Sequence, residues 1–257
     1  MAISVTNRDA CMNKSLLPVL ATCLISASAI AQSAFEGAYG QFGSGYENNS
    51  YSNLNSSGSN PTQNTPDAWS TGNQSSSGVP LVIGLGYYLS ATSHWLLGLG
   101  IDYSALTQQT SSFSSYSPTG GINNVPATVN GYQLQTSNRF NIFVTPGYVI
   151  DKDKLVYLKA GYSAVSMKET YPNTITKSTG TEPLTAWSKN PSATVSGYVL
   201  GLGYKQMITN GLYGFAEANY MSYGKPSFSA TNGLSYTVTN SPSLSTYQAL
   251  VGIGYKF

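Results

Sequence analysis

The residues best suited to chemistry are seven charged side chains, each set in an otherwise apolar or glycine-rich segment. They are Glu36, Asp102, Arg139, Lys159, Lys205, Glu217 and Lys256. Acids and bases that share a narrow interior can neutralise one another, whereas an unpaired buried charge strongly destabilises a fold. We call these seven residues the lumen charge network, and two interpretations of it stay open. The charges either pair with one another in a closed interior and stabilise the protein, or they form a polar pathway that conducts ions weakly when the pairs rearrange.

Catalytic chemistry has little support in the sequence. The single histidine, His94, lies in a predicted turn beside Trp95, so a Ser-His-Asp relay or a histidine-based metal site on the long loops has no histidine to use. The Gly-x-Gly pairs lie within predicted strands, whereas a phosphate loop needs a strand-to-helix turn. Lys and Arg form no cluster, which argues against a nucleic-acid partner. We expect no enzyme, no cofactor and no metal; a barrel-type lipid-modifying enzyme would need a catalytic residue on the outer rim, and none stands out.

The composition favours strands that cross a membrane. Only 9% of the 257 residues are charged, against about 25% in a typical soluble domain. No run of about 20 apolar residues follows the N-terminal segment, so no membrane-spanning helix is expected in the mature chain. The 26 Gly and 20 Tyr residues fit this class, because Gly relieves crowding on an interior face and Tyr suits a boundary between lipid and water.

The segment 1–31 has the features of a secretory signal peptide. A basic start at Met12 precedes an apolar stretch that ends in a small-x-small cleavage site after Ala31. Translation is expected to start at Met12, because the residues before it do not improve the signal. Lipidation of Cys23 is a weaker alternative, since the residue before it is bulkier than such a site prefers. The mature domain, 32–257, contains no cysteine, which fits an oxidising envelope compartment.

Eight predicted strands alternate with connections of two lengths. The strands lie at about 34–43, 79–90, 94–107, 135–150, 154–167, 193–207, 211–223 and 244–257. Long polar connections occupy about 44–78, 108–134, 168–192 and 224–243. Because tight turns separate these long connections, all long loops emerge at one end of the barrel and all turns at the other. This asymmetry is typical of outer-membrane barrels, whose long loops lie outside the cell and whose turns lie in the periplasm.

Side-chain alternation predicts which face of each strand meets lipid. Each strand has one apolar face, and the seven charges fall on the other face. The opposite phase would place them in lipid, where Arg or Lys near the midplane costs about 2–4 kcal/mol each. A soluble sandwich is the alternative, but its water-facing surface would be mostly Gly and Ser, which solubilises poorly. The outward aromatic residues of the predicted interfacial girdles are Tyr39, Tyr87, Trp95, Tyr103, Tyr148, Tyr204, Tyr220, Tyr247 and Tyr255.

The last strand carries the most specific pattern, because it ends the chain on an aromatic residue. Its apolar face includes Val251, Ile253, Tyr255 and Phe257. Together with the hairpin arms 197–204 and 213–220, this strand resembles the small eight-stranded outer-membrane β-barrel proteins of Gram-negative bacteria, which include the opacity-type adhesins and the OmpX and OmpA barrel domains. The resemblance covers 34–257. It implies that the barrel-assembly machinery recognises the C-terminal strand, and we carry this assembly signal over to the same four residues.

We expect an all-β, transmembrane, eight-stranded antiparallel up-and-down β-barrel in the outer membrane of a Gram-negative bacterium, present as a monomer. Its loops mix Ser, Asn and Thr with aromatic anchors, a composition also found in recognition surfaces. These anchors are Tyr46, Tyr51, Trp69, Phe113, Tyr116, Tyr171, Trp187, Phe228 and Tyr236. The expected role is structural or adhesin-like, with outer-membrane lipid, the assembly machinery and host or matrix ligands as partners. Two alternatives stay open: a hydrophilic, antigenic cover with no single ligand, and a narrow channel for ions or small solutes.

Overall fold

The computed structural model describes residues 33–62, 66–119, 125–188 and 190–257. The strands are β1 (Gly37–Ser52), β2 (Ser56–Ser59), β3 (Asp67–Trp69), β4 (Gln74–Gly78), β5 (Leu81–Ser90), β6 (Trp95–Ser104), β7 (Gln108–Gln109), β8 (Phe113–Ser117), β9 (Ala127–Asp151), β10 (Lys154–Thr170), β11 (Thr174–Lys177), β12 (Gly180–Pro183), β13 (Ser192–Met207), β14 (Leu212–Tyr223), β15 (Phe228–Thr231), β16 (Thr237–Asn240) and β17 (Ser243–Lys256). None of the described segments forms a helix with the length and hydrophobicity that a membrane crossing requires. The predicted signal peptide and the Met12 start lie outside the described residues.

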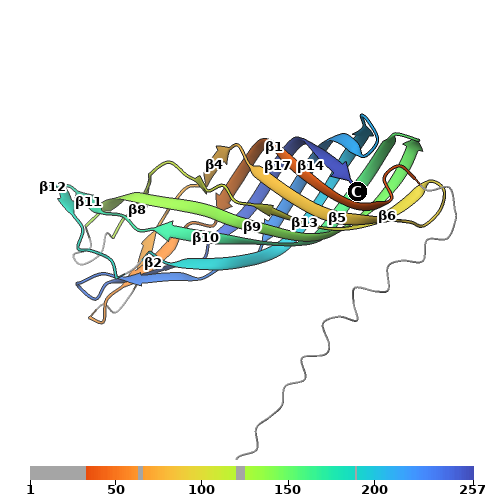
Figure 1. The fold of residues 1–257 in the computed structure, drawn as a ribbon. Coiled ribbons are helices and arrows are strands. Elements are labelled where there is room, and N and C mark those ends of the chain that lie inside the picture. Colours follow the sequence, from red (N-terminus) through yellow and green to blue (C-terminus); the bar gives the residue numbers. More distant parts are fainter. Residues whose placement is uncertain (1–32, 63–65, 120–124, 189) are drawn as a thin grey trace, which may run out of the picture. The chain divides into compact units, whose positions relative to one another are not determined.

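Eight of these strands form a closed antiparallel ring (Figure 1). The order is β1, β5, β6, β9, β10, β13, β14 and β17, and each strand pairs with the next ring strand along the chain. β17 closes the ring on β1, from Tyr39 opposite Lys256 to Ser52 opposite Ser243. Closure leaves the ring without a free edge, and it confirms the predicted eight-stranded up-and-down barrel.

The two ends of the barrel differ in their connections. Short turns join β5 to β6, β9 to β10 and β13 to β14, and in Figure 1 these turns lie at the end that also carries the C-terminus. The long connections leave from the other end, as the alternation of long and short segments predicts. Every additional strand of the described chain belongs to these long connections.

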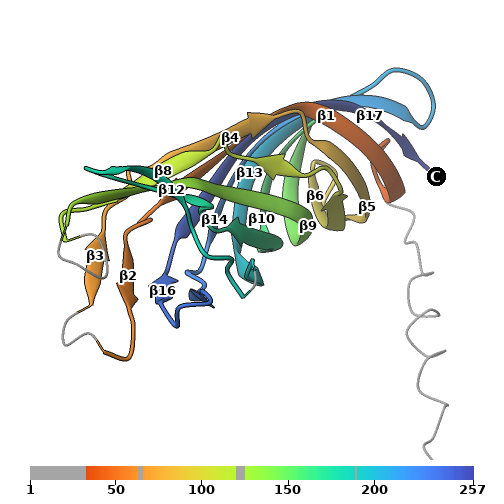
Figure 2. The same ribbon diagram turned by 90° about the vertical axis from the view of Figure 1, so that its left-hand side faces the viewer.

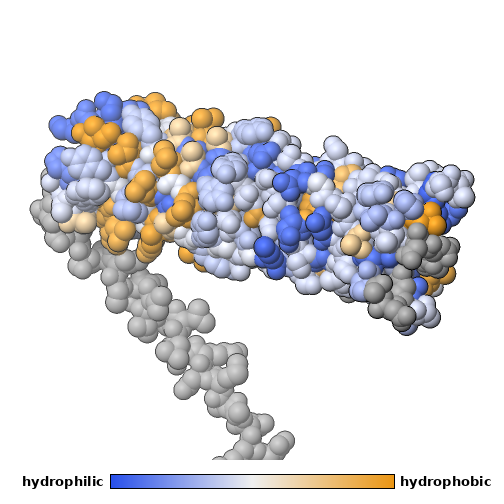
Figure 3. Space-filling model, turned by 180° about the vertical axis from the view of Figure 1, so that it is seen from behind, coloured by the Kyte–Doolittle hydropathy of each residue, from blue (hydrophilic) through white to orange (hydrophobic). Residues whose placement is uncertain are grey.

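On the face shown in Figure 3, apolar side chains gather on the outside of the half of the barrel that carries the short turns. On β10, for example, Leu158 is 62% exposed, whereas the next residue, Lys159, is 2% exposed and faces the lumen. This alternation of outward apolar and inward polar side chains follows the predicted faces on every ring strand except β1. The exterior of this half is therefore suited to lipid rather than to water.

In β1 the predicted faces are reversed, so the assignment of Tyr39 to the interfacial girdle is corrected. Tyr39 is 4% exposed and points into the lumen, whereas Phe42 and Tyr46 face outward. The expected phase was based on Glu36 as an inward charge of this strand. Glu36 instead lies before the first strand residue, Gly37, and is only partly buried, so it does not report which face of β1 points inward.

β1 and β9 extend far beyond their predicted ends, since β1 continues to Ser52 instead of 43 and β9 begins at Ala127 instead of 135, whereas β10 ends at Thr170, close to its predicted end at 167. In the parts of these three strands nearest the long connections, the polarity of the two faces inverts. Tyr51, Leu134 and Met167 point inward and are fully buried, whereas Lys168 on β10 is exposed on the outside. An apolar interior with a polar exterior is the arrangement of a water-soluble sheet. The membrane-spanning part of β10 therefore ends before Lys168.

The predicted long loops are largely folded. Segments of the first and fourth loops form a four-stranded sheet in the order β15, β16, β2 and β3 (Figure 2). β8 and β11 pair with the first half of β9, and β12 pairs with β11. Isolated bridges join Ser70 to Tyr116 and Trp187 to Asn232. Much of the Ser-, Asn- and Thr-rich sequence predicted as loops therefore lies in strands.

Candidate functional site

The centre of the lumen is a three-membered ion cluster. Lys159 Nζ on β10 donates hydrogen bonds to Asp102 on β6 at 2.7 Å and to Glu217 on β14 at 2.9 Å. Tyr157 OH donates to the second Glu217 oxygen at 2.7 Å, and Asn141 donates to Asp102. All three charged side chains are buried, so each depends on the others for its solvation.

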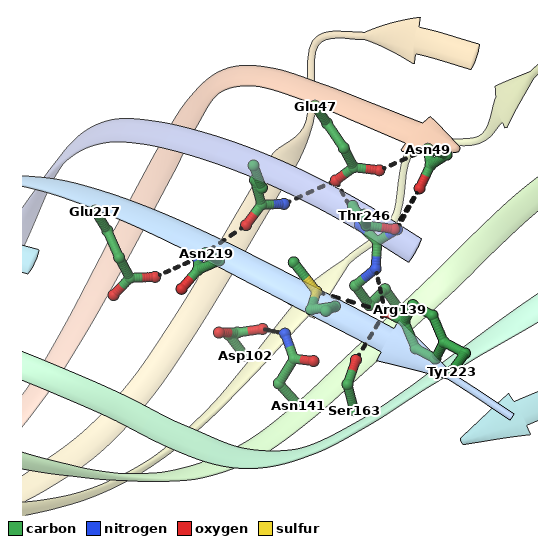
Figure 4. Close-up of polar contacts among 12 residues, drawn as sticks. Glu47, Asn49, Asp102, Arg139, Asn141, Ser163, Glu217, Asn219, Tyr223 and Thr246 are labelled. Carbon is green, nitrogen blue, oxygen red and sulfur yellow. Dashed lines mark hydrogen bonds and ion pairs between the residues drawn. The ribbon is translucent and has the colours of Figure 1, made fainter. Parts of the chain in front are cut away.

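A second ion pair lies nearer the long connections (Figure 4). Arg139 on β9 pairs with Glu47 on β1, and its guanidinium also donates to Asn49 Oδ1 at 2.9 Å, Thr246 Oγ1 at 3.2 Å and Tyr223 OH at 2.9 Å. Sequence reasoning missed Glu47, because it assigned this residue to a loop. The alternation of side chains along β1 could have revealed Glu47. If Tyr39 rather than Glu36 points inward, Glu47 lies on the same inward face.

The remaining buried lumen cation, Lys205 on β13, is enclosed by tyrosine rings. Its Nζ lies 3.9 Å from the ring centroid of Tyr39, 4.8 Å from Tyr213, 5.0 Å from Tyr88 and 5.4 Å from Tyr157. Each ring face attracts the ammonium group through its quadrupole, and such contacts are strongest where water is excluded. The inward orientation of Tyr39 supplies the nearest of these four rings, which explains why the side chain does not face lipid.

Two of the predicted lumen charges, Glu36 and Lys256, lie apart from this network at the end of the barrel that carries the turns. Glu36 is partly exposed and accepts a hydrogen bond from Ser90 Oγ. Lys256 is also partly exposed. The structure therefore brings together the other five predicted charges and adds Glu47 to them.

The lumen charges balance and leave little space. Three carboxylates, Glu47, Asp102 and Glu217, match three cations in the barrel interior. Glycines make room for the aromatic rings: a Cβ on Gly203 would collide with the ring of Tyr157. The void beside Arg139 has no room for a water molecule. This arrangement can hold charge and exclude solvent, as expected for an eight-stranded barrel whose interior is filled by side chains.

The long connections build a second, aromatic cluster outside the lumen. Trp69 Nε1 donates to Tyr236 OH at 2.9 Å, and Tyr236 OH donates to Asp67 at 2.7 Å. The rings of Tyr171 and Trp187 contact each other at a tilt of 35°, with centroids 4.9 Å apart. Beside this cluster lies a cavity of about 290 Å³ between β9, the β11–β12 hairpin and the β15–β16 pair. Four of the aromatic anchors predicted in the loops thus meet in one place.

The family model of the outer membrane protein β-barrel domain matches residues 17–257. The chain belongs to this family of outer-membrane β-barrel proteins. It is therefore a protein of the Gram-negative outer membrane. As in other outer-membrane barrels, we expect its long connections with their second sheet to be extracellular and its short turns to be periplasmic.

Comparison with solved structures finds barrels of the same class at low similarity. Neisserial surface protein A is 12% identical, with 86% of this chain and 100% of that chain covered and a TM-score of 0.43. OprG of Pseudomonas aeruginosa is 13% identical, covering 86% and 96%, with a TM-score of 0.43. Ail of Yersinia pestis is 12% identical, covering 86% and 99%, with a TM-score of 0.35. A comparison with curated proteins finds no match.

The outward aromatic residues fit the surface of an outer-membrane barrel. Trp95 and Tyr148 form an edge-to-face pair on the outside, with ring centroids 5.2 Å apart. Phe257 is 75% exposed, and its backbone N–H donates to the carbonyl of Ala38 at 2.9 Å. The placement of the girdle at the two membrane interfaces, and the role of the C-terminal strand as the assembly signal, remain predictions.

Residue types that can support catalysis or metal binding are dispersed in the part of the chain that the structure describes. His94 lies in the turn between β5 and β6 and stacks on Tyr148, with ring centroids 5.8 Å apart. Among the residues that the structure describes, no group of three His, Cys, Asp or Glu side chains could hold a metal ion. The two organised features of the protein are thus the lumen charge network and the extracellular aromatic cluster.

Proposed function

We propose that the protein is a surface-interaction protein, which recognises ligands outside the cell through the folded extension of its extracellular strands. The observation that carries this proposal is the order of that extension, where four long connections fold into paired strands and a common aromatic cluster. A binding surface that is already ordered loses less conformational entropy when a ligand binds. Polar residues and exposed aromatic side chains such as Tyr116 supply the chemistry of a recognition surface.

Several contacts hold the extension to the barrel. Asn240 on β16 donates a hydrogen bond at 2.8 Å to Glu169 on β10, which is a ring strand. Thr71 donates to Ser115 at 2.8 Å, which joins the first and second long connections. These contacts support a rigid presentation of the extracellular sheet, because they connect segments that lie far apart in the chain.

Binding to host cells or extracellular matrix should fall at least tenfold when the segments 56–69 and 228–240 are replaced by short Gly-Ser linkers, since this change removes the extracellular sheet and keeps the ring strands. The measurement is adhesion of bacteria that display each variant, with heat-modifiable gel migration to verify the barrel. The matched control replaces the periplasmic turn residues 209–210 by Gly-Ser and should bind as the wild type does. Unchanged adhesion after loss of the extracellular sheet would contradict the proposal.

The filled lumen supports this role over the alternative of a narrow channel. Three carboxylates paired with Arg139 and Lys159, together with Lys205 and its surrounding tyrosine rings, occupy the barrel interior. The purified protein in planar lipid bilayers should therefore give no discrete conductance steps. Reproducible unitary steps in the wild type, absent from protein-free bilayers, would favour the channel instead.

A further inference from the structure

The cavity beside the aromatic cluster has a size and a lining that can be compared with those of known ligand sites. Its volume of about 290 Å³ is roughly twice that of an engineered protein cavity of about 150 Å³ that binds benzene. Its apolar lining consists of Val125, Val129, Pro172, Ile175, Pro183, Leu184, Leu234 and Val238. Trp69, Tyr132, Trp187 and Tyr236 contribute aromatic rings. The size and lining fit one compact molecule of about two aromatic rings.

Several polar atoms around the cavity already have partners within the protein. Trp69 Nε1 donates to Tyr236 OH, and that hydroxyl donates to Asp67. Trp187 Nε1 donates to the carbonyl of Pro172 at 2.8 Å. A ligand that carried its own donors or acceptors would lose hydrogen bonds to water on entry and would gain few in return.

The charges at the rim form a pair. Lys177 Nζ, at the end of β11, lies 3.2 Å from Glu182 Oε2 on β12. The pair therefore contributes no net charge to the mouth of the cavity. An anionic ligand would meet Glu182, and a cationic ligand would meet Lys177. The electrostatics of the mouth therefore favour an uncharged occupant.

We propose that this cavity binds a small, uncharged, apolar molecule, held by contact with Trp187, Leu234 and the neighbouring apolar side chains. The driving force is the removal of apolar surface from water on both ligand and cavity. Leu234 is 59% exposed at the mouth, so a bound ligand would cover an apolar side chain that otherwise faces water. The inference goes beyond attachment to cells, because it assigns the extracellular sheet a second kind of ligand.

The test uses bromine quenching of tryptophan fluorescence in the full-length protein, held in lipid nanodiscs. The chain has three tryptophans, and the Trp95→Phe change removes the one that faces lipid. Trp69 and Trp187, which both line the cavity, then report contact with the probe 4-bromobiphenyl. Quenching should saturate with probe concentration, whereas partition into lipid alone gives a linear dependence.

Matched variants separate the cavity from the rest of the surface. Thr185→Phe fills the cavity and should weaken probe binding at least tenfold, a loss of about 1.4 kcal/mol. Thr239→Phe makes the same change on an exposed position of β16 outside the cavity and should leave binding within about twofold. Leu234→Lys, at an already exposed position, should also weaken binding and does not depend on how the fold accepts Thr185→Phe.

The outcomes decide between ligand classes. Saturable quenching that is lost in Thr185→Phe and Leu234→Lys supports the proposal. Linear quenching of equal slope in the Trp95→Phe protein and all three variants would overturn it, since the probe would then only dissolve in the lipid. Tighter binding of 4′-bromobiphenyl-4-carboxylate than of 4-bromobiphenyl would also overturn it, because the site would then select an anion through Lys177.

Discussion

The Lys159→Met protein should lose about 3–5 kcal/mol of its free energy of unfolding, the range typical for removing one partner of a buried ion pair. The change leaves Asp102 and Glu217 as carboxylates that no longer share a cation, although both lie within hydrogen-bond distance of the same nitrogen in the intact protein. Urea unfolding of the protein in lipid vesicles, followed by heat-modifiable gel migration, measures the shift of the midpoint.

Two companion variants make this result specific. Lys168→Met removes an exposed lysine from the same strand and should change the free energy of unfolding by no more than about 0.5 kcal/mol. Lys159→Met combined with Asp102→Asn leaves Glu217 to be balanced by Lys205, so it should recover much of the loss. A Lys159→Met protein as stable as the wild type would show that the cluster does not stabilise the barrel.

The extracellular sheet should become less stable as the pH rises from about 4.5 to 7, because of Glu169. Burial raises the pKa of Glu169 from 4.5 to about 7, and the hydrogen bond from Asn240 offsets this only in part. In this window the unfolded carboxyl ionises while the folded one stays protonated, so the free energy of unfolding falls with rising pH. The full shift corresponds to about 3 kcal/mol. Glu169 lies beyond Lys168, outside the membrane-spanning part of β10.

The groups that face Glu169 do not supply a compensating charge. Asn240 approaches from β16, while the phenols of Tyr132 and Tyr171 face it from β9 and from the segment after β10. Burial raises the pKa of both tyrosines, and the nearby Glu169 carboxylate adds to the shift. Both phenols are therefore neutral throughout the pH window in which Glu169 titrates. Protonation of Glu169 alone accounts for the expected pH dependence.

Urea unfolding at pH 5 and pH 8, in the Trp95→Phe background, measures this dependence through Trp69 and Trp187. The Glu169→Gln variant mimics the protonated side chain, so its midpoint should be nearly independent of pH and higher than that of the parent at pH 8. Glu182→Gln is the control, since the side chain of Glu182 is 55% exposed and should not alter the slope. Equal pH slopes in the Glu169→Gln variant and its parent would exclude Glu169 as the cause.

The sequence predicts the membrane-spanning part of the fold well, because lipid imposes a strict rule on it. A charge such as Asp102 or Lys159 within an alternating apolar strand has only one acceptable side, so the orientation of most ring strands follows from the residue types. The predicted orientation of β1 was wrong because the predicted segment is short and its one charge, Glu36, lies before the strand begins at Gly37. The error in this one strand moved Tyr39 outside and left Glu47 unrecognised.

The extracellular part was harder to predict for a physical reason. Outside the membrane the outward residues meet water, so the strands carry Ser, Thr and Lys on the exposed face and apolar residues such as Leu134 and Met167 inside. This polarity is opposite to that of the membrane-spanning part of the same strand. A prediction that requires one face to be apolar throughout therefore ends the strand at the point where the apolar residues change face. The positions of Trp69, Trp187 and Tyr236 around one cavity depend on pairings between distant segments, which composition does not specify.

The pairing of the first and last ring strands has a consequence for biogenesis. Because β1 hydrogen-bonds to β17 along its length, the barrel cannot close until β17, the last ring strand, has been made. Contacts between such distant segments form slowly, since a large loop must be ordered before they are reached. Until the barrel closes, the segment that forms β1 lacks its β17 partner and the apolar residues of the strands are exposed to water. A chaperone that binds the unfolded precursor would then be needed to prevent aggregation.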